Sequence, residues 1–257
     1  MHVLALDTTT PDGSAALVDE HRTIDERRGD AARTHGERLP GELLALARAH
    51  GLAARAIDLF AVASGPGSFT GLRIGIATIQ GLALATGRRI VAVSALEALA
   101  QTVGAGAGPA PGAAGTFVAA WMDARRDDVF AALYRLADAP LFSPERLVEI
   151  EGPTAADPAA TLAQWDAHIR HAAVVFVGDG VARHAAAIAA QAAPRWKTLP
   201  RHPLLAGAIG RMAVARAQRG DTIEPAAVRP LYVRRPDAEV ARDDDRRRAG
   251  PPVGGRS

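Results

Sequence analysis

Residues 65–75, with the sequence GPGSFTGLRIG, join a buried strand predicted at 58–64 to an apolar helix predicted at about 70–86. Glycines at such a junction let the backbone turn sharply and approach another group closely, while Ser68 or Thr70 can cap the helix. Backbone N–H groups at a helix start also suit a phosphate. The stretch, however, matches neither GxxxxGK(S/T) nor GxGxxG, and no lysine follows it. We therefore favour a structural turn, formed by Gly65, Gly67, Ser68, Thr70 and Gly71.

The elements around this turn occur in the same order twice. Apolar runs and turn signals predict a first half with strands at 3–6, 14–18 and about 22–27, a helix at 37–50, a strand at 58–64, a helix at 70–86, a strand at 90–93 and a helix at 94–102. They predict a second half with strands at 117–123, 128–136 and 145–151, a helix at 157–169, a strand at 173–177 and helices at 181–192 and 204–219. Two repeated βββαβα halves indicate the α/β fold of the actin, Hsp70 and sugar-kinase superfamily.

Composition suggests where the two halves divide. Residues 104–115, GAGAGPAPGAAG, have no core-forming side chains and are expected to be a flexible linker between an N-terminal lobe (1–103) and a C-terminal lobe (116–233). The stretch 234–257 is charged and rich in Gly and Pro, so we expect a disordered tail.

The composition also excludes several function classes. There is no cysteine, which rules out disulfides, thiolate catalysis and zinc held by cysteine. The start of the chain has no basic leader and no run reaches a membrane span, so we expect a soluble cytoplasmic protein without a membrane contact. A net charge of +2 permits contact with RNA but does not require it.

A longer string resembles one family. Residues 64–100, SGPGSFTGLRIGIATIQGLALATGRRIVAVSALEALA, resemble the TsaB family, formerly called YeaZ. Other features that match in order are LALDTTT (4–10), THGERL (34–39), MDARRDDVF (122–130), GDG (178–180) and PLYVRRPDAE (230–239). The likeness covers the chain to about residue 239 and is looser in the second half.

This resemblance implies a function. TsaB is the bacterial partner of TsaD, the subunit that transfers a threonylcarbamoyl group from its adenylate to an adenosine beside the tRNA anticodon. The resemblance implies a chain that lacks the catalytic centre, pairs with TsaD through its N-terminal lobe, is joined by the ATPase TsaE and meets tRNA only indirectly. It also implies that the chain alone can form a homodimer through much the same surface.

In each half, the first strand ends in an aspartate. In the actin-like superfamily such residues help to hold metal and phosphates, so Asp7, Thr8 and Asp123 are candidates for a vestigial nucleotide site that binds ATP or ADP weakly with Mg²⁺. The alternative, which we favour, is that each aspartate caps the turn that follows its strand. We expect no bound cofactor in the protein's own function.

No catalytic or metal centre is predicted. A TsaD-type subunit needs two histidines near HxxxH, but His35 has no histidine four residues later, and the other histidines are scattered. Ser68 lies at a strand–turn–helix corner, yet the pattern is not GxSxG and no base can be assigned to it.

The helix at 70–86 is apolar almost all round, with Arg73 and Gln80 as its strongly polar positions. Such a helix must be covered on two sides. The sheet can cover one stripe, and a partner protein or the helices at 37–50 or 94–102 can cover the other. We favour the partner. The predicted interface residues are Leu72, Ile74, Thr78, Gly81, Leu82 and Ala85.

Three hypotheses follow for the function. The first is a non-catalytic subunit that scaffolds or regulates a TsaD-like enzyme. The second is an actin-like nucleotide-binding phosphotransferase or ATPase that acts alone. The third is an RNA-binding module, which only the Arg-rich stretch after residue 234 supports.

Overall fold

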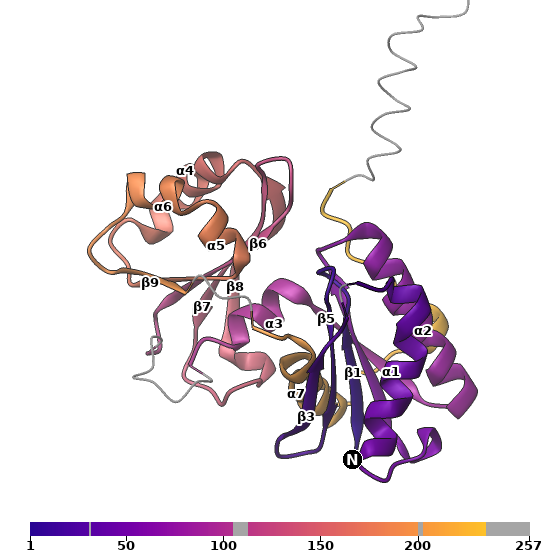
Figure 1. Ribbon diagram of the computed structural model, residues 1–257. Coiled ribbons are helices and arrows are strands. Elements are labelled where there is room, and N and C mark those ends of the chain that lie inside the picture. Colours follow the sequence, from indigo (N-terminus) through magenta and orange to yellow (C-terminus); the bar gives the residue numbers. More distant parts are fainter. Residues whose placement is uncertain (31, 105–112, 200–202, 235–257) are drawn as a thin grey trace, which may run out of the picture.

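Two five-stranded mixed sheets organise the chain (Figure 1). The computed structural model describes residues 1–30, 32–104, 113–199 and 203–234. Within these residues the strand orders are β3-β2-β1-β4-β5 and β10-β9-β6-β7-β8. Because β1 and β6 each pair with one antiparallel and one parallel neighbour, the two sheets have the same topology.

The halves also repeat element by element. The first contains β1 (Val3–Asp7), β2 (Ser14–Val18), β3 (Thr23–Arg28), α1 (His35–Ala49), β4 (Leu59–Gly65), α2 (Phe69–Thr86), β5 (Arg89–Ser94) and α3 (Ala95–Gln101). The second contains β6 (Phe117–Asp123), β7 (Val129–Leu136), β8 (Leu147–Ala156), α4 (Pro158–Ile169), β9 (Val174–Val177), α5 (Asp179–Arg183), α6 (Ala185–Gln191), β10 (Trp196–Leu199) and α7 (Ala206–Ala217). Short 3₁₀ turns lie at Ala54–Ala56, Pro144–Arg146 and Pro225–Ala227. The repeated βββαβα order confirms the predicted actin-like fold.

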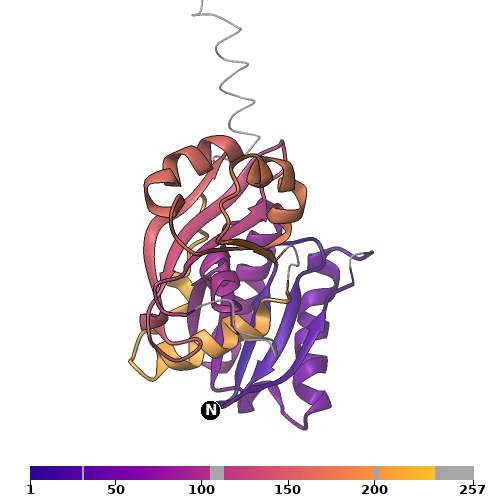
Figure 2. The ribbon, with the colours of Figure 1, turned by 90° about the vertical axis from the view of Figure 1, so that its left-hand side faces the viewer.

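The elements stack in five layers (Figures 1 and 2). Helices α1 and α2 cover the outer face of the first sheet, and α4, α5 and α6 cover the outer face of the second. The last helix of each half, α3 and α7, lies between the two sheets. One apolar core therefore runs from the inner face of the first sheet through α3 and α7 to the inner face of the second.

Helix α7 departs from the expected division of the chain. Residues 116–233 were assigned to a C-terminal lobe, but α7 packs across the strands of the first sheet. Gly210 makes this approach close, because a Cβ there would lie 2.5 Å from Val18 Cγ2. The first turn of α7 is capped by the first sheet as well. Ser14 Oγ accepts from Ala206 N at 3.1 Å, and Glu26 Oε1 accepts from Gly207 N at 2.7 Å.

An ion pair joins the two middle helices. Arg216 Nη2 lies 2.7 Å from both carboxylate oxygens of Glu97, and both side chains are largely buried. The pair ties α3 of the first half to α7 of the second.

Two details of the second half were not predicted. Strand β10 was missed, and the helix expected at 181–192 is interrupted at His184, which ends α5 and begins α6. Most of the linker predicted at 104–115 and of the tail predicted at 234–257 falls outside the described residues, so both remain predictions.

Candidate functional site

The glycine-rich turn packs against the loop that follows β1. Gly65 has φ +121°, a conformation that favours glycine. A Cβ on Gly67 would lie 2.6 Å from Thr9 Cβ, and one on Gly71 would lie 2.3 Å from Thr8 O. Thr8 and Thr9 therefore fill the space that a side chain at Gly67 or Gly71 would need, which is a structural reason for these glycines that requires no phosphate.

The turn is closed by hydrogen bonds within the protein. Ser68 N donates to Thr9 O at 2.9 Å, and Ser68 Oγ accepts from Gly71 N at 3.3 Å as the N-cap of α2. Thr70, the other candidate cap, is exposed in the first turn of the helix. The turn thus fixes the start of α2 against the end of β1.

The two aspartates of the proposed nucleotide site occupy equivalent places. Asp7 is 2% exposed, and its Oδ1 accepts from Thr9 N at 2.9 Å and Thr9 Oγ1 at 2.7 Å. Asp123 Oδ1 accepts from Arg125 N at 2.8 Å and lies 3.4 Å from Arg183 Nε. Each carboxylate thus caps the residue two places later in the chain. Thr8 is fully buried. This geometry favours the turn-capping role over nucleotide binding.

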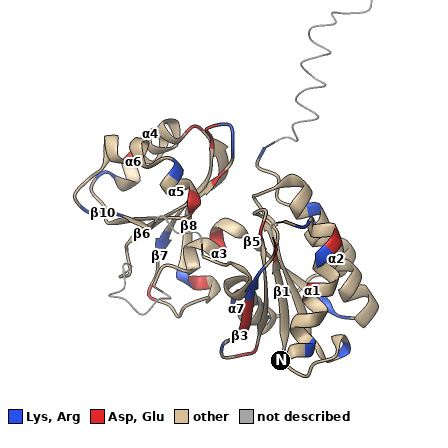
Figure 3. Ribbon diagram, in the orientation of Figure 1, with Lys and Arg blue, Asp and Glu red and all other residues tan. Residues whose placement is uncertain are grey.

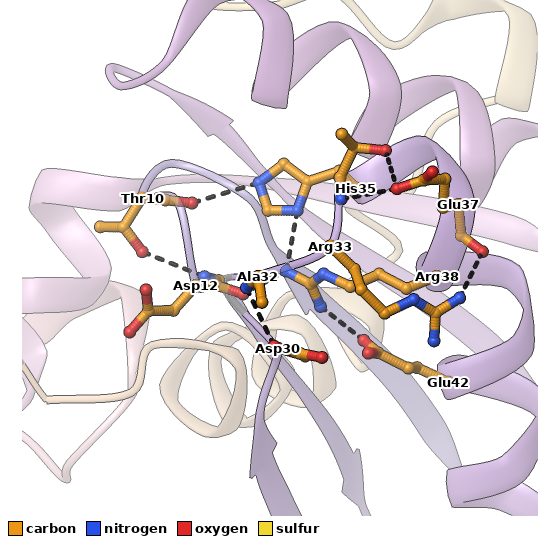
Figure 4. Close-up of polar contacts among 11 residues, drawn as sticks. Thr10, Asp12, Asp30, Ala32, Arg33, His35, Glu37, Arg38 and Glu42 are labelled. Carbon is orange, nitrogen blue, oxygen red and sulfur yellow. Dashed lines mark hydrogen bonds and ion pairs between the residues drawn. The ribbon is translucent and has the colours of Figure 1, made fainter.

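His35 belongs to a polar cluster at the start of α1 (Figure 4). Its Nε2 lies 3.2 Å from Thr10 O and its Nδ1 lies 2.9 Å from Arg38 Nη2. Because a carbonyl only accepts and a guanidinium only donates, His35 is neutral with its proton on Nε2. Burial, and next the charge of Arg38, lower the pKa of His35. Arg38 also pairs with Glu42 at 2.5 Å and donates to Asp12 O.

This cluster ties the loop after β1 to α1 and offers little to a metal. The residue four places after His35 is Leu39, which is 2% exposed and contributes to the core. Over the ranges that the structure describes, no group of three His, Asp or Glu side chains is placed to hold a metal ion.

The outer face of α2, the helix that follows the turn, is an exposed apolar surface. Leu84 is 64% exposed, Ala77 and Ala85 are exposed, and a Cβ on Gly81 would meet nothing within 4 Å. Of the described helices, α2 is the one long and apolar enough to cross a membrane, with 33% of its span buried. It packs on the first sheet beside α1, as a core helix of a folded domain does.

The predicted interface residues divide into three groups. Leu72 is 1% exposed and packs inward, unlike the prediction, so it offers no surface to a partner. Gly81 and Ala85 are exposed. Ile74, Thr78 and Leu82 are half-buried, and Ile74 and Leu82 pack against the apolar core that α1 and α2 share.

Sequence reasoning missed two contributors to this face. Leu84 lies on the same side of the helix as Arg73 and Gln80. Because those two residues are polar, the sequence pattern did not identify this side as part of an apolar face. Tyr232 lies far away in the sequence, but its ring stacks on Phe69 at 4.8 Å and its hydroxyl accepts from Arg73 Nε at 2.9 Å.

Known proteins resemble this chain over most of its length. The family model described as TsaD, tRNA N6-adenosine threonylcarbamoyltransferase, matches residues 28–242. YeaZ from Pseudomonas aeruginosa superposes with a TM-score of 0.70 at 31% identity, covering 90% of this chain and 99% of that one. An uncharacterized protein of Mycobacterium tuberculosis is 32% identical over 240 residues, which are 92% of this chain and 93% of the relative.

Two relatives bear functional names. The tRNA threonylcarbamoyladenosine biosynthesis protein TsaB of Escherichia coli is 37% identical over 135 residues, covering 52% of this chain and 55% of that protein. The Bacillus subtilis protein of the same name is 29% identical over 184 residues, covering 72% and 73%.

Fold and family model together define an actin-like protein of the TsaD class. Within that class the chain belongs to the TsaB, or YeaZ, family, as the sequence motifs indicated.

Proposed function

We propose that this chain is a non-catalytic subunit required for N6-threonylcarbamoyladenosine formation in tRNA beside the anticodon, where it scaffolds or regulates a TsaD-type catalytic subunit. Membership of the TsaB family supports this role, since the relatives of Escherichia coli, Haemophilus influenzae and Bacillus subtilis are named tRNA threonylcarbamoyladenosine biosynthesis proteins.

The site chemistry supports a non-catalytic role. A pair of histidines one helical turn apart would bind a metal, but the second place is taken by the buried Leu39. His35 itself is engaged by Thr10 and Arg38. The proposal therefore assigns the transfer chemistry to the partner.

The observation that carries the proposal is the outer face of α2. Small residues at Ala77 and Gly81 allow another helix to approach closely, and Leu84 supplies an apolar side chain that a partner would bury. Burying a leucine stabilises an interface by about 1.5–3 kcal/mol. We propose that the partner's helices pack here, beside α1.

The remaining partners are part of the same proposal. A TsaE-type ATPase joins the pair, and tRNA is contacted indirectly through the assembly. The chain alone self-associates through the α2 face when no partner covers it.

Co-purification with the TsaD of the same organism tests the proposal. Gly81→Glu and Ala85→Glu should each abolish pairing, because a desolvated charge has no counterpart on an apolar face. Ala163→Glu, at an exposed position of α4 in the second half, is the matched control and should pair normally. The isolated chain should modify no tRNA. Normal pairing by both α2 variants would refute the placement of the interface, and no pairing by the unaltered chain would refute the function.

A further inference from the structure

A segment distant in sequence runs along the flank of α2. Residues 222–234 follow α7, and Ile223 exchanges backbone hydrogen bonds with Ile90 at 2.8 and 3.0 Å. Gln80 Nε2 donates to Pro225 O at 2.7 Å, and Leu231 N donates to Ser64 O at 2.7 Å. The segment is thus fixed to the first sheet at both ends, to β5 by Ile223 and to β4 by Leu231, and to α2 through Gln80 between them.

A hollow of about 340 Å³ remains between this segment and α2. Its apolar lining comes from Ile76, Val228 and Pro230, and its polar rim includes Arg73, Arg229 and Tyr232. Two positive charges and no negative charge line it. The hollow is therefore a basic pocket beside an apolar helix face.

Arg73 is held in place on one side and open on the other. Its guanidinium carbon lies 3.9 Å from the centre of the Phe69 ring, and its Nε donates to Tyr232 Oη at 2.9 Å. In the described part of the chain, its two terminal nitrogens have no hydrogen-bond partner and it forms no ion pair. A guanidinium with a fixed plane and two free terminal nitrogens matches the geometry of a carboxylate.

Arg229 adds the second charge. Its Nη1 donates to Ala226 O at 2.6 Å and to Val228 O at 2.9 Å, which orients the side chain from its own backbone. Elsewhere Arg27, Arg89 and Arg216 each meet a carboxylate of this chain. Within the described residues Arg229, like Arg73, meets none.

We infer that this basic pocket binds a carboxylate carried by the TsaD-type partner, an inference that rests on the proposed function. The pocket adjoins Ala77 and Leu84 on the exposed face of α2. A partner helix that packs on those residues would place an Asp or Glu side chain over Arg73, with its methylene groups on the apolar lining. A fixed cation beside an apolar face sets the orientation of the partner, because a docking without an acidic residue there leaves the charge desolvated and unpaired.

Binding measurements with purified TsaD and the full chain test the pocket. Arg73→Ala should weaken binding by about tenfold or more, and Arg229→Ala by roughly fivefold, because each leaves a partner carboxylate without its counterion. Arg73→Lys keeps the charge but loses the paired donors, so it should restore only part of the affinity. Arg135→Ala, an exposed position of β7, is the matched control and should leave the affinity unchanged. Thermal unfolding of each variant confirms that it is folded.

The outcomes separate the pocket from the proposed function. Binding within about twofold of the unaltered chain by both Arg73→Ala and Arg229→Ala would refute the pocket while pairing stands. If the unaltered chain fails to bind TsaD, the proposed function and the pocket fail together. Inorganic phosphate or ATP that binds the isolated chain in an Arg73-dependent way would show a small-anion site and overturn the assignment to a partner carboxylate. Loss of self-association alone in Arg73→Ala would assign the carboxylate to a second copy and overturn it also.

Discussion

Replacing Gly75 by alanine would place a methyl group where helix α2 crosses the end of β1. The new Cβ would lie 2.2 Å from Thr8 Oγ1 and 2.9 Å from Thr8 Cγ2. Thr8 is fully buried, and its branched side chain has little freedom to rotate away. Restoring ordinary contact requires α2 to move by roughly 1 Å, since non-bonded atoms rest about 3.5 Å apart.

The net cost follows from two opposing terms. Overpacking a well-filled site costs about 1–3 kcal/mol. Alanine gains about 1 kcal/mol over glycine from helix propensity. Because the Thr8 contact is severe, we expect the first term to exceed the second by about 1–2 kcal/mol in the free energy of unfolding. For a chain of this size that lowers the Tm by roughly 2–8 °C.

Gly81→Ala is the matched control on the same helix. A Cβ there meets nothing within 4 Å, so only the propensity term acts. It should raise the Tm by about 2–4 °C. Calorimetry of both variants measures the difference, and Gly75→Ala in a Thr8→Ala background should be less destabilising than in the unaltered chain. Equal Tm values for Gly75→Ala and Gly81→Ala would refute the close-contact explanation of the turn.

Other perturbations test the fold and the alternative functions. Burial is the largest cause that raises the pKa of Glu26 in the folded protein. The contribution of Glu26 to stability is therefore full below its unfolded pKa and is lost as the pH rises through its folded pKa. Across that pH window Glu26→Gln should become more stable relative to the unaltered chain, and parallel curves of Tm against pH would contradict this. Glu97→Gln should lower the free energy of unfolding by about 2–3 kcal/mol in urea titrations, because it leaves the charge of the mostly buried Arg216 without its partner. A loss of stability smaller than that caused by breaking an exposed ion pair would contradict this. Calorimetry of the isolated chain with Mg-ATP should show no tight binding, and tight binding lost in Asp7→Ala would favour the nucleotide-dependent alternative. Deleting 235–257 should leave tRNA association of the assembly intact, whereas its loss would support the RNA-binding hypothesis.

The repeated order of elements was predictable because most strands are continuous apolar runs. Strand β10 was not predicted, because it lies at the edge of the sheet with Lys197 and Thr198 exposed, and an edge strand does not need an apolar run. The repeat itself carried a signal for it, since β5 follows the corresponding helix in the first half.

Long-range packing set the limit for the site. The sequence predicted a turn at Gly67 and Gly71, but nothing local identified Thr8 and Thr9 as the groups they approach. Helix α2 is apolar almost all round, so its pattern did not distinguish the buried Leu72 from the exposed Leu84. The distribution of charge did not locate a functional site either, because acidic and basic residues are interspersed over both halves (Figure 3).

The place of α7 governs how the chain can fold during its synthesis. The hydroxyl of Ser14 can cap α7 only after Ala206, 192 residues later in the chain, has been synthesised. At about 5–20 residues per second, a ribosome needs roughly 10–40 s for this interval. Until then the inner face of the first sheet, including Val3 and Ala5, lacks the helix that covers it in the folded protein. The half that is made first is therefore among the last to be completed, and a nascent chain stalled before α7 would present an apolar sheet to chaperones.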